Sequence, residues 1–356
     1  MSSIRLQKLR KILDQLDLDA FLITFPPHLR YISGFSGSSG LAVVKKNSAW
    51  IFTDGRYTQQ IREETLGWKV HIAGGSLFEE LKKTSSLLAL MRVGIDGNTM
   101  MLTEFHQLKK IFPRVKFIPK VDTIEQITAV KDIGEIENIR SAVRITDKVF
   151  KDLLPMVKPG VSELDLSAEI SYRHRKYGAE GDAFEPIVAS GKRSALPHGK
   201  ASSKKIRKGE LLTLDFGCTY NGYHSDMTRT IVVGKPTSEM KDIYDAVLTA
   251  QMLAIEAAKD GIKSRDLDGV ARYSIKTAGY DKYFRHSLGH GVGLQIHESP
   301  RISMQSKAVI EKGNVVTIEP GIYIPQFGGV RIEDILVITN DGSENLTRSP
   351  KHLIIV

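Results

Sequence analysis

Hydrophobic positions near the start of the chain recur at three- and four-residue intervals. Four leucines within residues 4–17 follow this spacing, which predicts an amphipathic helix with one apolar stripe. Short apolar runs bounded by Gly, Pro, Asn or Asp come next, and a helical pattern covers residues 56–64. This alternation of strands and helices predicts a small α/β domain over residues 1–122. The runs that predict its strands are residues 20–24, 40–44, 50–53, 93–96 and 115–118.

The pattern after residue 122 is typical of a second, mixed domain. Residues 132–154 keep a helical period, and a capping box at Ser162 begins another helix that extends to about Tyr177. The remainder is rich in strands, and one further helix, at about residues 239–259, separates two groups of them. We therefore expect a second domain of α+β class over residues 123–356.

The strand-rich groups contain an internal repeat. Residues 206–217 align with residues 310–321 at an offset of 104, and five of the twelve positions are identical. Each copy is a Lys-Gly turn followed by an alternating strand, so Asp215 and Glu319 lie opposite a row of apolar side chains. We expect both carboxylates mid-strand on an interior or cleft-facing surface, where an unpaired charge is costly. A cation is therefore expected near them.

Each copy of the repeat is followed by a second acid. Asp226 lies eleven residues after Asp215, and Glu333 lies fourteen residues after Glu319. Four acids that converge from matched positions would repel one another unless divalent cations neutralise them. For any single acid, an ordinary surface position or an ion pair with an arginine such as Arg331 is the better interpretation. The matched positions of all four favour a metal site.

Composition limits the kinds of site and location. The chain has 356 residues, 41% of them apolar, which is enough to bury two cores. Its single cysteine, Cys218, excludes an internal disulfide and a cysteine-rich zinc site, so a metal must use carboxylate and imidazole ligands. No apolar run reaches membrane-spanning length, and the charged N-terminus is unlike a signal peptide. A cytoplasmic protein without a membrane partner is expected.

The net charge of +9 is concentrated in the predicted first domain. Residues 1–122 contain 18 Lys and Arg against 11 Asp and Glu, whereas residues 123–356 contain 32 against 30. The basic residues are scattered and are not interleaved with aromatic residues, as single-strand binding would require. A solvated basic surface is therefore favoured, and no nucleic-acid partner is expected.

A loop with several histidines lies between the two copies of the repeat. Three glycines within residues 284–298 argue against a helix, so His286 and His290 do not form the helical pair of zinc proteases. His290 is flanked by glycines and is a candidate metal ligand. The candidate ligands are therefore Asp215, Asp226, His290, Glu319 and Glu333.

Several motifs recur together in one known family. They are Leu-Asp-Phe-Gly at 214–217, His-Gly-Val-Gly at 290–293, Ile-Glu-Pro-Gly-Ile-Tyr at 318–323 and Val-Arg-Ile-Glu-Asp at 330–334. Together they resemble the M24 metallopeptidases of pita-bread fold, and most closely the Xaa-Pro branch with aminopeptidase P and prolidase. Residues 190–199 resemble a catalytic-domain segment of this family. Residues 31–40 and 53–57 resemble its creatinase-type N-terminal domain, so the resemblance covers nearly the whole chain.

The resemblance implies a fold and a metal content. The fold is α+β, with a C-terminal pita-bread catalytic domain preceded by a smaller α/β creatinase-type domain. Asp215 would chelate one metal through both oxygens, and Asp226 and Glu333 would bridge the two metals. His290 and Glu319 would complete the second metal. Two divalent ions are expected, with manganese preferred over cobalt, iron or zinc.

The resemblance also implies roles for further residues. Glu319 would be the general acid–base group, and His198 and His297 would donate hydrogen bonds to the substrate carbonyl. His286 would lie on the proline side of the substrate. For Arg331 two interpretations stay open, either binding the substrate or offsetting the charge of the acids.

The preferred prediction is an Xaa-Pro aminopeptidase, that is, aminopeptidase P. It would use water activated by two metals to hydrolyse the bond between an N-terminal residue and a following proline. The near alternative is a prolidase, which acts on Xaa-Pro dipeptides, and the alternative from another class is a non-catalytic binding protein with the pita-bread fold. A peptide with proline in second position is the expected partner, together with a second copy in a homodimer.

Overall fold

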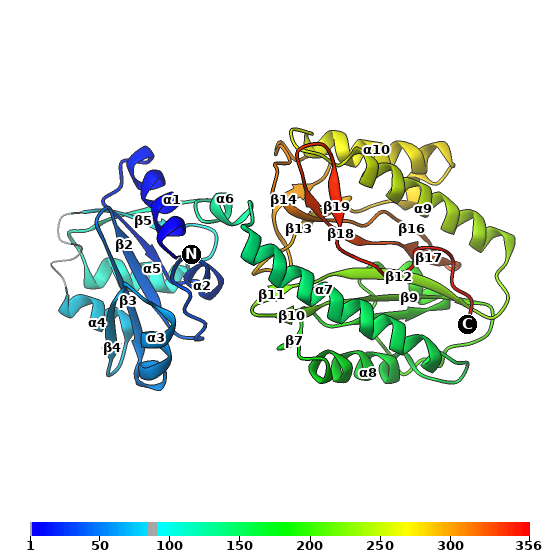
Figure 1. Cartoon of the computed structure of the whole chain (residues 1–356), viewed down its shortest axis with the longest axis horizontal. Helices are drawn as coiled ribbons and strands as arrows, with labels where there is room; N and C mark the ends of the chain where they lie inside the picture. Colours follow the sequence, from blue (N-terminus) through cyan, green and yellow to red (C-terminus); the bar gives the residue numbers. More distant parts are fainter. Residues whose placement is uncertain (1, 85–87, 89–90) are drawn as a thin grey trace. The chain divides into compact units, whose positions relative to one another are not determined.

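The structure, a computed structural model, describes residues 2–84, 88 and 91–356. The chain divides into two compact units, Met1–Thr128 and Ala129–Val356, coloured blue to cyan and green to red in Figure 1. The sequence alone placed the boundary a few residues earlier, after residue 122. Among the described residues, no helix combines the length and the apolar character that crossing a membrane requires.

A mixed sheet forms the centre of the first unit. Its strands are β1 (Ala20–Ile23), β2 (Leu41–Lys45), β3 (Ser48–Asp54), β4 (Lys69–Ala73), β5 (Arg92–Asp96) and β6 (Lys116–Lys120). Their order in the sheet is β4-β3-β2-β1-β5-β6. β1 pairs antiparallel with β2 and parallel with β5, and all four of its residues are buried. A strand in the middle of a sheet covered on both faces is expected to be apolar along its whole length, as this one is.

Helices connect the strands of the first unit. They are α1 (Ser2–Gln15), α2 (Pro26–Ser33), α3 (Thr58–Glu64), α4 (Leu77–Lys83), α5 (Leu102–Ile111) and α6 (Glu125–Thr128). The leucine stripe of α1 faces inward, because Leu9 and Leu13 are fully buried. Two prolines begin α2, where their missing N–H groups would have no intrahelical partner in any case.

The second unit contains several small sheets. Its strands are β7 (Gly181–Asp182), β8 (Ile187–Ser190), β9 (Glu210–Phe216), β10 (Cys218–Tyr220), β11 (Tyr223–His224), β12 (Met227–Val233), β13 (Gly289–Gly291), β14 (Glu298–Ile302), β15 (Val315–Ile318), β16 (Gly321–Ile324), β17 (Gly328–Arg331), β18 (Asp334–Ile338) and β19 (Ser343–Asn345). The sheets have the strand orders β11-β10-β7, β12-β9-β8, β14-β13-β15-β18-β19 and β16-β17.

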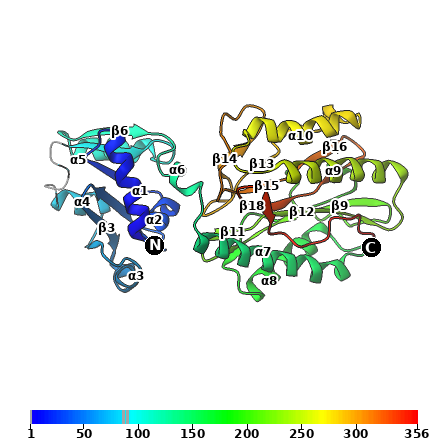
Figure 2. The same ribbon diagram turned by 45° about the horizontal axis from the view of Figure 1, so that its top comes forward.

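Two pairs of helices enclose the strands of the second unit. They are α7 (Ile133–Leu153) with α8 (Glu163–Lys176), and α9 (Ser238–Ala257) with α10 (Ser264–Thr277). The strands lie between the two pairs in both views (Figures 1 and 2). Apolar residues of β8, β9 and β12 pack with α7 and α8, and those of β15, β17 and β18 pack with α9 and α10. The strands are therefore covered by helices on two sides.

The repeat predicted from the sequence occupies matching places in these two halves. One copy forms β9 and the other forms β15, and the turns before them place Gly209 and Gly313 at φ +80° and +85°. Residues with a Cβ rarely adopt this left-handed backbone conformation. The positive φ therefore explains why glycine occupies this turn in both copies. The apolar rows of both strands are buried, as expected.

Most predicted elements occur near their expected positions, but some helices were missed. Residues 132–154 and 162–177 correspond to α7 and α8, with Ser162 as the N-cap whose side chain accepts from Asp165 N–H. α2, α4, α5 and α6 of the first unit were not predicted. The expectation of a single further helix after α8 was wrong, because α10 follows α9.

Candidate metal centre

The four predicted acids converge from separate strands of the second unit. Asp215 lies within β9, Asp226 directly before β12, Glu319 directly after β15, and Glu333 between β17 and β18. The mid-strand placement expected for Glu319 was therefore wrong, because β15 ends at Ile318. Asp215, Asp226 and Glu333 are buried, and Glu319 is partly buried. The ends of strands from both halves thus bring the acids together.

Hydrogen bonds hold some oxygens of these acids and leave others unpartnered. Arg331 Nη2 donates to Asp215 Oδ2 at 2.5 Å, and Thr228 Oγ1 donates to Glu333 Oε2 at 2.7 Å. The Oδ1 atoms of Asp215 and Asp226 are buried and have no hydrogen-bond partner among the described residues. A buried oxygen without a partner is costly, which indicates that a cation belongs beside these atoms.

Burial and mutual repulsion raise the pKa values of the acids. Burial is the main cause for Asp226, followed by the charges of Glu333, Asp215 and Glu319, and its pKa lies well above the usual value. Burial and the charge of Glu333 likewise raise the pKa of Glu319. Burial and the charge of Asp215 raise the pKa of Glu333 to about 8. Glu333 therefore holds a proton near neutral pH unless a cation compensates the charge, and the protonated forms of Asp226 and Glu319 are favoured in the same direction.

His290 reaches this group from β13. A Cβ added to the preceding Gly289 would meet backbone atoms of Thr317, so glycine allows β13 to approach β15, the strand directly before Glu319. Burial, and then the charge of His297, lowers the pKa of His290 to about 4, so the ring is neutral. Its Nδ1 lies 3.1 Å from the carbonyl oxygen of Gly291, which therefore accepts the ring proton. The lone pair of His290 is consequently on Nε2.

This lone pair points at carboxylate oxygens. His290 Nε2 lies 3.6 Å from Asp226 Oδ2 and 3.5 Å from Glu319 Oε1. One ligand atom each of Asp226, His290 and Glu333 lies within 4.8 Å of the others. An unprotonated nitrogen facing acceptor oxygens is stabilised by a metal ion between them, and a backbone carbonyl behind the other nitrogen is the usual support. The arrangement of Asp226, His290 and Glu333, with Glu319 beside His290, therefore fits a divalent metal ion.

Three further histidines surround the group of acids. His198 and His297 are exposed, and the rings of His290 and His297 meet edge to face with centroids 4.3 Å apart. Burial and the charge of His198 lower the pKa of His297, which places these two exposed histidines within electrostatic range of each other. Both are therefore candidates for contact with a molecule bound at the acids.

His286 belongs to a chain of hydrogen bonds. Burial, followed by the charge of Arg331, lowers its pKa to about 3, so it is neutral. Its Nδ1 lies 2.8 Å from the Ser287 carbonyl oxygen and donates to it, so Nε2 accepts from Tyr323 Oη at 3.0 Å. Arg331 Nη1 donates to the same Tyr323 Oη at 2.6 Å. Both ring nitrogens of His286 are thus occupied by the protein.

The guanidinium of Arg331 is engaged on all sides. Besides Asp215 and Tyr323, it donates from Nε to Thr228 Oγ1 at 2.9 Å and from Nη1 to the Pro197 carbonyl oxygen at 3.2 Å. The side chain is buried against these partners. Of the two interpretations left open by the sequence, this geometry favours the one in which Arg331 offsets the charge of the acids.

Sequence reasoning missed several supporting residues. Tyr323 lies in a recognised motif but received no role, although it links Arg331 to His286. A buried ion pair joins Lys131 to Glu298, the residue that follows His297. Lys131 and Glu298 are 167 positions apart in the sequence, so no local pattern could have revealed the pair.

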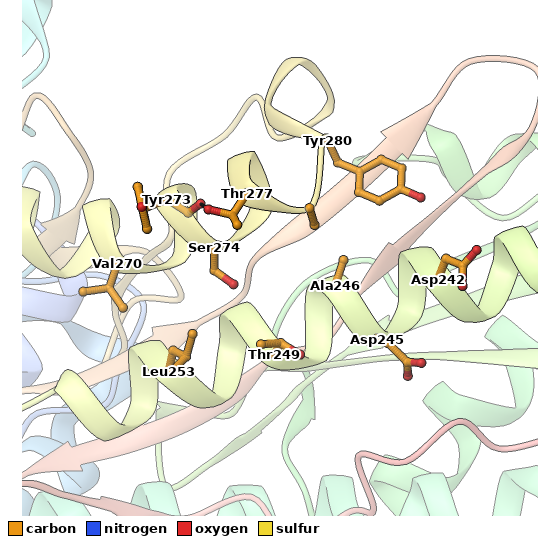
Figure 3. Close-up of a pocket in the computed structure, with 11 residues that line it drawn as sticks. Asp242, Asp245, Ala246, Thr249, Leu253, Val270, Tyr273, Ser274, Thr277 and Tyr280 are labelled. Carbon is orange, nitrogen blue, oxygen red and sulfur yellow. Dashed lines mark hydrogen bonds between the residues drawn. The ribbon is translucent and has the colours of Figure 1, made fainter.

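A groove elsewhere in the second unit has a different character. It lies between α9 and α10, has a volume of about 790 Å³, and is lined by Leu253, Val270, Tyr273 and Tyr280 (Figure 3). Asp242 and Asp245 lie along one side of it on α9, and no histidine is among the described residues that line it. The groove lacks the convergence of acids and imidazole found around His290, so we place the candidate active site at the acids.

Two known families match the two parts of this chain. The family described as metallopeptidase family M24 matches residues 137–340, and the creatinase/prolidase N-terminal domain matches residues 5–130. The first match lies in the second unit and contains all five candidate metal ligands.

Individual relatives match along nearly the whole chain. An Xaa-Pro dipeptidase of Pyrococcus furiosus is 42% identical over 356 residues, which cover 98% of this chain and 99% of its own. The structure of an Xaa-Pro dipeptidase from Bacillus anthracis has a TM-score of 0.97 at 40% identity and covers 100% of both chains. An X-Pro aminopeptidase from Thermotoga maritima has a TM-score of 0.90 at 39% identity, covering 96% of this chain and 99% of its own. These matches confirm the predicted fold class, a creatinase-type domain followed by a larger α+β domain.

Proposed function

The chain belongs to metallopeptidase family M24 and is a metal-dependent exopeptidase, and from this premise we propose that it is an Xaa-Pro dipeptidase. The observation that carries the proposal is the convergence of four acids and His290 in a chain that resembles Xaa-Pro dipeptidases along nearly its whole length. The substrate would be a dipeptide with proline in second position. The reaction would be hydrolysis of its single peptide bond.

The relatives favour one of the two Xaa-Pro activities considered from the sequence. The sequence interpretation preferred aminopeptidase P, with prolidase as the alternative. Proteins named Xaa-Pro dipeptidase match at 40–42% identity and favour the alternative. The similarity to the Thermotoga maritima X-Pro aminopeptidase, at 39% identity, keeps aminopeptidase P as the second candidate.

Two divalent metal ions would be held by the five converging side chains. Asp215 and Asp226 supply the unpartnered buried oxygens, and His290 supplies an unprotonated Nε2. Glu319 and Glu333 complete the donor set. When bound, such ions activate water as a nucleophile and polarise the substrate carbonyl. We propose manganese as the resident metal because the donor set is rich in oxygen. A cytoplasmic location and a homodimer stay predictions.

The remaining side chains would bind the substrate and move its proton. Glu319 is the acid–base group, because its carboxylate lies among the ligands and burial makes it ready to hold a proton. His198 and His297 are exposed beside the acids and would donate hydrogen bonds to the oxygen on which charge develops. Arg331 holds Asp215 in place through its hydrogen bond to Oδ2.

His286 would contact the proline side of the substrate through its ring carbons. Both of its nitrogens are occupied within the protein, and its neutral state removes the cost of placing a charge against an apolar ring. Proline has no N–H to bind, so an apolar surface suits it better than a hydrogen-bond acceptor.

The experiment is a comparison of substrate lengths. The manganese-loaded protein is given an Xaa-Pro dipeptide, an Xaa-Pro-Xaa tripeptide and a longer peptide with the same first residue, and kcat/KM is measured for release of that residue. We expect the dipeptide to be cleaved with a kcat/KM at least roughly 100-fold higher than the longer substrates, a difference of about 3 kcal/mol in transition-state binding.

Two results would overturn the proposal in different ways. Comparable kcat/KM for the tripeptide would assign the chain to aminopeptidase P. An Xaa-Ala dipeptide cleaved as fast as Xaa-Pro would show that proline is not recognised at all.

A further inference from the structure

A buried arginine beside the candidate metal centre holds the backbone of one proposed metal ligand. Arg229 on β12 is only 1% exposed, and its Nη1 donates to the carbonyl oxygen of Glu333 at 2.6 Å and to that of Thr228 at 2.9 Å. The N–H of Glu333 donates in turn to the Thr228 carbonyl oxygen at 3.1 Å, and Thr228 Oγ1 donates to the Glu333 carboxylate at 2.7 Å. The main chain and the side chain of this ligand are therefore both held from β12.

The other N–H groups of Arg229 bind the C-terminal segment, residues 346–356, and the residue that follows the ligand. Nε donates to the Pro350 carbonyl oxygen at 3.0 Å. Nη2 donates to the Ser349 carbonyl oxygen at 2.8 Å and to Asp334 Oδ1 at 2.7 Å. All five N–H groups of the guanidinium are thus used, which is the full donor capacity of an arginine. This planar group fixes the distance between the C-terminal segment and the ligand.

The C-terminal segment is itself anchored on helices of both pairs. Asp147 on α7 accepts three hydrogen bonds from it, from the N–H of Arg348 at 2.9 Å and from the N–H and Oγ of Ser349 at 2.8 and 2.5 Å. Tyr244 Oη on α9 donates to the carbonyl oxygen of Lys351 at 2.9 Å. The segment therefore joins α7 and α9 to the backbone of the metal ligand.

We propose that Arg229 and the C-terminal segment position Glu333 and thereby set the affinity of the site for metal ions. The inference rests on the proposed function, because it needs metal ions at the converging acids. Distances between a metal and its ligands vary by only about 0.2 Å, so a ligand fixed at its backbone and its carboxylate needs less rearrangement on binding. Arg229 and the segment act through Glu333, so they are positioning groups and not ligands.

The experiment measures manganese affinity in variants that leave every proposed ligand in place. The full-length parent, Asp147→Asn and Arg229→Lys are freed of metal with a chelator, and manganese binding is followed by isothermal titration calorimetry. Asp147→Asn replaces one acceptor oxygen of the anchor with an NH2 group, and the three N–H donors of a lysine cannot span the five bonds of Arg229. We expect the dissociation constant to rise by at least about 10-fold in both variants, the usual effect of losing a group that supports a metal ligand.

Two further variants separate positioning from a general loss of stability. Asp152→Asn is the matched control, because Asp152 is also a partly buried aspartate of α7 but accepts from Tyr177 Oη at 2.6 Å. It should bind manganese like the parent. Asp147→Glu keeps both acceptor oxygens and should recover most of the affinity. A purely structural role would lower the melting temperature and leave the dissociation constant, measured well below that temperature, unchanged.

The outcomes distinguish this inference from the proposed function. If Arg229→Lys does not fold, Asp147→Asn is the deciding variant. An unchanged dissociation constant in Asp147→Asn, or an equal rise in Asp152→Asn, would overturn the positioning role while the parent still binds manganese. A parent that binds no divalent ion would contradict the proposed function, and the inference with it.

Discussion

The four acids and His290 form a site whose charge is not balanced by the side chains in contact with it. Arg331 donates a hydrogen bond to Oδ2 of Asp215. The Oδ1 atoms of Asp215 and Asp226 are buried and have no hydrogen-bond partner among the described residues. Burial raises the pKa of Asp226 and Glu319, and the neighbouring acids add to this effect. At the scale of single residues, the proposed functions are therefore holding a cation and acting on a substrate beside it, and Glu319 has both.

Two substitutions distinguish these functions. Asp226→Asn is expected to lose bound metal and activity together, because it removes a charge from a buried ligand oxygen. His198→Ala is expected to keep its metal content and to lower kcat by roughly 100-fold, the usual cost of one lost donor to a developing oxyanion. Elemental analysis and dipeptide kinetics on the same samples check both outcomes.

The contrast between the two variants is what tests the assignment. Loss of metal in His198→Ala would make this histidine a ligand and not a donor to the substrate. Full metal content in Asp226→Asn would remove it from the ligand set.

At the scale of elements, the sequence predicts whatever repeats or alternates locally. The repeat located β9 and β15, and with them Asp215 and Glu319, because both copies keep the turn glycine and the apolar row. α10 was not predicted because its few buried positions lie within a polar helix that begins with Ser-Arg-Asp. These positions include Leu267, Ala271 and Ile275. Its partner α9 supplies the surface that buries them, and that packing is not visible in a local pattern.

Contacts between distant segments are the part of the site that the sequence could not supply. The chain of hydrogen bonds from Arg331 through Tyr323 to His286 depends on β17, β16 and the loop before β13 lying together. The carboxylates themselves could be predicted because both copies of the internal repeat place an acid at the same position. Tyr323 and Arg331 lie outside the repeat, so no matching position in the other copy pointed to them.

The ion pair of Lys131 and Glu298 connects the first residues of the second unit to β14. Its side chains are 1% and 3% exposed, and β14 begins directly after His297. Removing one partner of a buried pair leaves the other charge uncompensated. Glu298→Gln is therefore expected to lower the free energy of unfolding of the second unit by about 3 kcal/mol, and to reduce kcat by displacing His297.

Circular dichroism and tryptophan fluorescence measure this effect together. Both tryptophans lie in the first unit, so urea denaturation should shift the dichroism transition more than the fluorescence transition. The double variant with Lys131→Met should recover part of the lost stability, because no unpaired charge remains. The exposed Lys83→Met serves as the control for loss of a lysine, and it should change neither transition. An unchanged dichroism midpoint in Glu298→Gln would contradict a role for the pair.

At the scale of the whole molecule, each unit has its own core, and the candidate metal centre lies in the second unit. The core of the first unit surrounds its mixed sheet, whereas the second unit divides its apolar residues between two helix pairs. The acids of the second unit lie where strands from its two halves meet, so their repulsion opposes the association of those halves. Metal content and pH should therefore control the stability of this unit as a whole.

The metal-free protein is expected to become less stable as the pH rises above about 6.5. Burial and Asp215 raise the pKa of Glu333 from 4.5 to about 8, so the folded chain holds a proton that the unfolded chain has released. This contribution is complete below the unfolded value and is lost as the pH rises through about 8. The lowered pKa values of His286 and His290, about 3 and about 4, act in the opposite sense but only below the unfolded value of 6.5. The window from pH 6.5 to 8 therefore isolates the carboxylates.

Thermal unfolding followed by circular dichroism measures this dependence across the window. The melting temperature of the chelator-treated parent should fall with pH, while that of Glu333→Gln, which cannot ionise, should fall less. Adding manganese should reverse the slope of the parent, because metal binding requires the deprotonated carboxylates and so strengthens as the pH rises. Equal slopes for the metal-free parent and Glu333→Gln would mean that Glu333 is already ionised in the folded chain. The charge of the four acids would then be balanced by the protein itself, and the physical argument for two metal ions would lose its main support.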